Sequence, residues 1–233
     1  AKGWGSGGRD HFDTTSPLYR YIASLTKLRR ENRVLSRGTP KVLAGEAAGA
    51  GALVYLMQDG SETLLIAMNT ADHPVLLDNL DIGQGSGTVL QPLFAMDGKA
   101  PLLVVGQNQR LTTQLAPHAG TVWRVSKAPP LSLKAAPPAL SLDALPQGPV
   151  TEPTLTVRGQ ATPGEELKLV LDGNLGESQS LQADATGRWQ AKLSTAAFVD
   201  ETITHRVTAY SVKSGQASPA GTFNVRPSWS LRN

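Results

Sequence analysis

Short runs in which every second residue is apolar recur along much of the chain, and they constrain the fold more than any other feature. In Arg188–Leu193 the apolar residues are Trp189, Ala191 and Leu193, and His205–Tyr210 alternates in the same way. A period of two places such residues on one face of a β-strand, with the opposite face toward water. The chain is therefore expected to be mainly β.

Turn signals separate these runs. Asp59-Gly60 stands between the apolar runs Leu53–Met57 and Thr63–Met68, which predicts a β-hairpin. Strands this short, at this spacing, are typical of sandwiches or Greek-key barrels. The other predicted strands are Val75–Leu77, Thr88–Leu93, Leu102–Val105, Gln109–Leu115, Thr121–Val125, Thr154–Val157, Glu166–Leu171 and Gly221–Val225.

One convincing amphipathic helix precedes the strands. Ser16-Pro17 is a helix start, because Ser favours the N-cap and Pro the first helical position. The pattern fades after Arg33, and Gly38 with Pro40 closes it. The apolar stripe of this helix needs a packing surface. We expect part of that surface to lie outside this chain. The stripe comprises Leu18, Tyr21, Ile22, Leu25 and Leu28.

Residues 127–149 are rich in proline and have little periodicity, which predicts a semi-rigid linker between two domains. We expect a first β-domain at 37–126, a second at 150–227, and a tail at 228–233. Five leucines indicate that part of the linker lies on a domain surface. They are Leu131, Leu133, Leu140, Leu142 and Leu145.

Composition removes several classes of function. The 233 residues contain no cysteine, which excludes disulfides and thiolate chemistry. The net charge is only +3 and the basic residues are scattered, so we expect no nucleic-acid partner. No apolar run approaches the ~20 residues that span a bilayer, so we expect no membrane span.

Candidate catalytic and metal-binding groups are few. Asp10, His11 and Asp13 lie together in a loop without a recognisable partner. His73, His118 and His205 are far apart and lack the spacing of metal ligands, so we interpret them as turn or surface residues. We therefore predict no catalytic residue and no metal site in the chain.

Tryptophans outside the predicted strands are the candidate ligand-binding residues, because an exposed indole offers a flat apolar face on which a ligand can stack. Trp4 and Trp229 lie outside the predicted strands and are the weak substrate-binding candidates. Trp123 and Trp189 lie in alternating strands and are expected in the core.

The segment Phe12–Arg20, continued by Leu25, Leu28-Arg29 and Asn32, resembles the last barrel helix of glycoside hydrolase family 13, which includes α-amylases and cyclodextrin glucanotransferases. Ala52–Asn69 is similar to the first hairpin of that family's domain C, and Leu115–Trp123 resembles its end. The resemblance implies that residues 1–36 are a remnant of the catalytic (β/α)₈ barrel and that 37–126 is a Greek-key domain C. The catalytic carboxylates would then precede this chain.

The second domain resembles bacterial immunoglobulin-like repeats of exported proteins. The residues that carry this resemblance are Val157–Gly164, Asp184–Trp189 and His205–Ser218. Asp184 to Gly187 is predicted to form a tight turn that brings Trp189 into the core.

These resemblances imply two tandem β-sandwiches at the non-catalytic C-terminal end of an α-amylase-like enzyme acting on starch-like α-glucans. The partner would be the catalytic barrel, with α-glucan as a second candidate partner. Cofactors are expected to be absent from this chain, with calcium a candidate in the barrel, and the location to be extracellular or periplasmic. The alternative is a stand-alone extracellular carbohydrate-binding or adhesion module. Sequence upstream of Ala1 would discriminate between the two.

Overall fold

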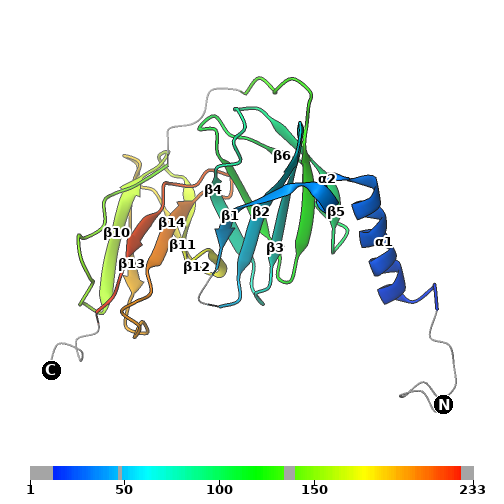
Figure 1. Ribbon diagram of the computed structural model, residues 1–233. Coiled ribbons are helices and arrows are strands. Elements are labelled where there is room, and N and C mark those ends of the chain that lie inside the picture. The colour runs from blue at the N-terminus through cyan, green and yellow to red at the C-terminus, as the bar shows by residue number, and fades with distance from the viewer. Residues whose placement is uncertain (1–12, 47–48, 134–139, 227–233) are drawn as a thin grey trace, which may run out of the picture.

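The computed structural model describes residues 13–46, 49–133 and 140–226, and it is mainly β (Figure 1). Helix α1 (Pro17–Glu31) begins at the predicted proline. A second helix, α2 (Val34–Arg37), follows directly and ends at Gly38. The prediction of a single helix was therefore wrong. A second helix of four residues precedes the first strand, and the buried side chain of Val34 holds it against the sandwich.

The first β-sandwich closes over residues 39–125. One sheet has the strand order β1-β2-β3-β8-β5-β6, and β4 with β7 lies opposite. The predicted hairpin is confirmed, since β2 and β3 pair from Ala52↔Asn69 to Asp59↔Glu62. The strands are β1 (Thr39–Gly45), β2 (Ala52–Asp59), β3 (Glu62–Asn69), β4 (Val75–Leu80), β5 (Val89–Ala95), β6 (Leu103–Val104), β7 (Leu111–Leu115) and β8 (Gly120–Val125).

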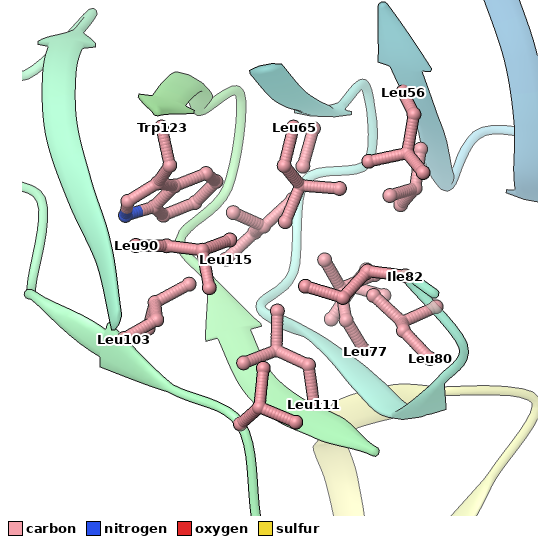
Figure 2. Packing of buried hydrophobic residues seen from close by; sticks show 14 of the residues in the cluster. Leu56, Leu65, Leu77, Leu80, Ile82, Leu90, Leu103, Leu111, Leu115 and Trp123 are labelled. Carbon is pink, nitrogen blue, oxygen red and sulfur yellow. The ribbon is translucent and has the colours of Figure 1, made fainter. Parts of the chain in front are cut away.

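The core of this sandwich consists of aliphatic side chains that surround a single indole ring, that of Trp123 (Figure 2). Leu56 and Leu65 from the larger sheet meet Leu77 and Leu111 from β4 and β7, and Trp123 closes one side. All five side chains are buried, because alternate residues of each strand face the opposite sheet.

The second β-sandwich packs β13-β10-β9 against β15-β14-β11-β12. Its core again comes from alternate residues, among them Val157, Leu169 and Val207. The strands are β9 (Ser141–Leu142), β10 (Thr154–Gln160), β11 (Glu166–Leu171), β12 (Asn174–Gln182), β13 (Arg188–Ser194), β14 (His205–Tyr210) and β15 (Gly221–Phe223). Two tandem sandwiches are thus present, as expected from the alternation.

The described part of the predicted linker is partly folded. Leu131 N donates to Gly87 O at 2.8 Å, which ties the segment to the first sandwich. Leu140 is 4% exposed, and β9 adds to the second sandwich by pairing Leu142 with Gly159. Residues 140–142 therefore belong to the second sandwich, because their leucines contribute to its core.

One sheet passes from the first sandwich into the second. Its order is β15-β14-β11-β12-β4-β7, and β12 meets β4 at the pair Asn174↔Val75. Leu76 N donates to Gly173 O at 2.8 Å, and Leu175 N donates to Pro74 O at 3.0 Å. The two sandwiches are therefore hydrogen-bonded neighbours within a shared sheet.

Side chains seal this junction. Asp78, whose side chain is 2% exposed, accepts hydrogen bonds from Arg206 Nη2 at 2.5 Å and Thr208 Oγ1 at 3.0 Å. Asn79 Nδ2 donates to Ser218 O at 2.7 Å. An apolar cluster of Leu76, Val170, Leu175 and Tyr210 packs in the same junction. The contact thus combines a buried charge pair with burial of apolar surface.

Candidate functional site: an uncovered helix face

Helix α1 is positioned by its start and its end. Before it, Asp13 Oδ1 accepts from Thr15 Oγ1 at 2.6 Å and from Thr15 N at 2.8 Å. The Thr15 hydroxyl, with the Thr15 backbone N–H, holds the pKa of Asp13 below its usual value. Ser16 has extended ψ and makes no side-chain cap bond, so Pro17 and the Asp13 turn mark the start. Asp13 thus acts in a turn.

The end of α1 is anchored to the first sandwich through Asn32, which is 5% exposed. Asn32 Nδ2 donates to Leu28 O at 2.7 Å, while Arg124 Nη2 on β8 donates to Asn32 Oδ1. The amide therefore caps the helix and links it to a central strand, which fixes the helix C-terminus on the outer face of the larger sheet.

Only one side of the apolar stripe is covered. The Tyr21 ring lies 6.1 Å from the Phe94 ring, centroid to centroid. Leu28 packs against the outer-sheet cluster that includes Val34, Leu64 and Ile66. These contacts hold α1 against the sheet along a single line of side chains.

The other side of the stripe faces water. Leu18 is 66% exposed, Ile22 54% and Leu25 37%, and no residue of α1 is buried. The spacing i, i+4, i+7 puts these three side chains in one row on the helix surface. Helix α1 also lies at the end of the molecule away from the second sandwich (Figure 1). We call Leu18, Ile22 and Leu25 the α1 row; it is an exposed apolar part of the helix surface.

The structure places the other sequence candidates as follows. Trp4, Trp229, Asp10 and His11 lie outside the described residues. Trp123 is 1% exposed and Trp189 3%, which confirms both as core residues. Neither indole can offer its face to a sugar.

The histidines are not all surface residues. His118 Nε2 lies 2.7 Å from Asp72 Oδ1 in an exposed turn, as expected. His205, however, is 7% exposed, its ring stacks on Phe198 at 4.0 Å, and its Nδ1 lies 2.8 Å from Asp172 Oδ2. The surface interpretation was wrong for His205, because a carboxylate and aromatic packing make its burial tolerable.

Within the described ranges, no group of three His, Asp or Glu residues could hold a metal ion. None of the described helices has the length and apolar character needed to cross a membrane.

Sequence reasoning did not anticipate the junction between the sandwiches. A signal was present, since Val75-Leu76-Leu77 is apolar without alternation. A continuous apolar run is typical of a strand buried on both faces. In the structure Val75 and Leu77 face the first core, while Leu76 faces the second sandwich.

Comparison with known proteins gives one clear sequence relationship. No protein-family profile matches the chain. Over 215 residues, which are 91% of this chain, its sequence is 26% identical to an α-amylase of Streptomyces lividans. The chain is homologous to an α-amylase. It spans 20% of the length of that relative.

Solved structures of an α-amylase and a cyclodextrin glucanotransferase are similar to this chain at lower sequence identity. The α-amylase of Geobacillus thermoleovorans has 20% sequence identity and a TM-score of 0.42, covering 51% of this chain and 25% of that chain. A γ-CGTase from Bacillus clarkii has 18% identity and a TM-score of 0.41, covering 93% of this chain and 30% of that chain.

Proposed function

We propose that this chain is the non-catalytic C-terminal region of a glycoside hydrolase of the α-amylase family that acts on starch-like α-glucans. In this proposal the first sandwich is domain C, the second is an immunoglobulin-like module, and α1 is the last helix of the catalytic barrel. The observation that carries the proposal is the α1 row, which is apolar and remains 37% to 66% exposed in the structure.

The physical role is to stabilise the barrel by burying this row. Removing apolar surface from water contributes about 25 cal/mol per Å², or roughly 1.5–3 kcal/mol for a fully buried leucine or isoleucine. The homologous relative is about five times longer than this chain, since the chain spans 20% of its length. That length leaves room for a catalytic barrel, which takes about 250 residues.

The test uses the complete polypeptide with the double substitution Leu18→Asp and Ile22→Asp. Two buried carboxylates at the barrel contact should lower its stability by several kcal/mol, on the order of the burial lost. We expect a lower Tm and a shorter half-life of starch hydrolysis at elevated temperature. Val199→Asp is the matched control, because Val199 is 63% exposed on the second sandwich.

Two results would overturn the proposal. One is an equal Tm for the double variant and the Val199→Asp control. The other is a reading frame that encodes no barrel ahead of Ala1. In that case the chain by itself would be an independent module, and saturable binding of soluble starch to the isolated chain would identify it as carbohydrate-binding.

The proposal has consequences for location and chemistry. The resemblance of the second domain to repeats of exported bacterial proteins supports an extracellular or periplasmic location. Hydrolysis needs two carboxyl groups flanking the bond, and the proposal assigns both to the barrel, together with any bound calcium. The purified chain should therefore release no reducing sugar from soluble starch.

A further inference from the structure

A cavity of about 560 Å³ lies beside the free edge of β7, close to the junction of the two sandwiches. Its wall comes from β7, from the loop that precedes β6, and from Tyr210 of the second sandwich. Pro74, which accepts a junction hydrogen bond, also contributes. Pockets that hold small ligands have about 300–1,000 Å³ and often lie between domains.

Three hydroxyl groups in this wall lack protein partners. Thr113 is 9% exposed, Thr121 5% and Tyr210 7%, yet no described residue hydrogen-bonds to their hydroxyls. Among the described residues, Trp189 Nε1 is the fully enclosed side-chain polar atom without a partner, so each of the three hydroxyl oxygens keeps some accessible surface. Burial raises the pKa of Tyr210. Buried polar groups are ordinarily paired, so these accessible hydroxyls are free to bind water or a ligand.

The remaining lining points to a neutral ligand. Asp97 and Lys99 carry opposite charges in the same loop, and Gln114 adds an amide. Pro101 and Pro117 supply apolar surface. Several uncharged hydroxyls combined with small apolar faces match the two sides of a sugar ring, which bears hydroxyls at its rim and C–H groups on its faces.

We propose that this cavity binds a short neutral saccharide, of about two sugar units, through the hydroxyls of Thr113, Thr121 and Tyr210. Because Tyr210 belongs to the second sandwich and β7 to the first, the bound sugar contacts both. The site is separate from the α1 row, and it rests on the proposed function only for the choice of an α-glucan disaccharide as probe.

The experiment titrates the isotope-labelled chain with maltose and follows backbone and side-chain resonances by NMR. We expect saturable shifts at residues around the cavity. Removing one hydroxyl by Thr113→Val, Thr121→Val or Tyr210→Phe should weaken binding roughly 2- to 10-fold, the effect of losing one hydrogen bond. Thr88→Val is the matched control, because Thr88 is 7% exposed, its hydroxyl has no described partner, and it lies outside the cavity. The spectrum of each variant reports whether it is folded.

The outcomes separate this site from the proposed function. No saturation with maltose or cellobiose, or equal weakening by Thr88→Val, would overturn the site. Preference for maltose over cellobiose would support both the site and its link to α-glucans. Equal affinity for both disaccharides would support the saccharide site and count against that link. None of these results depends on a barrel.

Discussion

Each sandwich has one tryptophan in its core, but only one of the two indole N–H groups is hydrogen-bonded to a described residue. In the first sandwich Trp123 Nε1 donates to Pro101 O at 2.9 Å. In the second, Trp189 Nε1 is buried and has no partner among the described residues. An unpaired buried donor costs about 1–3 kcal/mol. The second sandwich therefore gains more from packing around its indole than it loses in hydrogen bonding.

Gly159 explains how tightly the second indole is held. A Cβ atom at this position would lie 2.5 Å from Trp189 Cζ2 and 2.0 Å from Ser141 O. Glycine lets β10 approach both the indole ring and β9. The residues predicted as linker thus close the core beside the tryptophan, so the second sandwich depends on a contact that the first does not need.

The largest expected effect comes from Trp189→Ala. Truncating a buried tryptophan costs about 3–5 kcal/mol, a large share of the roughly 5–15 kcal/mol that stabilise a domain. We expect the second sandwich to unfold at much lower temperature while the first keeps its fold, as measured by thermal melting followed by NMR signals from each sandwich. An unchanged melting profile together with loss of glucan affinity would instead show that Trp189 binds sugar at the surface. The two tryptophans would then not be comparable core residues.

A smaller effect is expected from Asp78→Ala, which tests whether the sandwiches are independent. The substitution removes the acceptor of both Arg206 and Thr208. Because the Arg206 side chain is 39% exposed, water can solvate its guanidinium, and the cost should be about 1–3 kcal/mol.

Denaturant unfolding followed by NMR signals from each sandwich measures this cost. We expect two unfolding transitions that move apart relative to the unsubstituted chain. Glu177→Ala, an exposed residue on β12, is the control. Coincident transitions with an unchanged midpoint would show that the charge pair adds nothing to the junction.

The smallest effect, and the sharpest comparison, comes from replacing each tryptophan by phenylalanine. Both changes remove similar ring volume, but Trp123→Phe also leaves the Pro101 carbonyl without its donor, whereas Trp189→Phe removes an unpaired N–H. We expect Trp123→Phe to cost about 1 kcal/mol more than Trp189→Phe. Urea unfolding of the two variants measures the difference. A larger cost for Trp189→Phe would mean that its indole N–H has a partner in solution.

Local patterns predicted most of the strands, because alternation and turn residues are properties of neighbouring positions. Trp189, Ala191 and Leu193 do share one face, and Asp184 to Gly187 forms the expected turn, with Gly187 N donating to Asp184 O at 3.0 Å. Strand β12 was missed, since its burial does not alternate. Its place depends on the hairpin with β11, from which two residues separate it, and on pairing with β4, which belongs to the other sandwich.

The candidate sites were less predictable for the same reason. The α1 stripe was visible as a period of 3.6 residues, but which of its residues remain uncovered depends on where Phe94 and the outer sheet lie. The cavity beside β7 joins Thr113, Thr121 and Tyr210, which come from three strands and two sandwiches. No spacing in the sequence brings these hydroxyls together.

The shared sheet makes the two sandwiches poor candidates for exchange as separate modules. A protein engineer who cut the chain after residue 126 would expose Leu76 to water and leave buried Asp78 without its cation. The strand edges of β4 and β12 would become bare at the cut, and bare edges invite pairing with other chains. Recombination of this chain with others should therefore move residues 39–226 as a single unit, and grafts of the second sandwich alone should tend to aggregate.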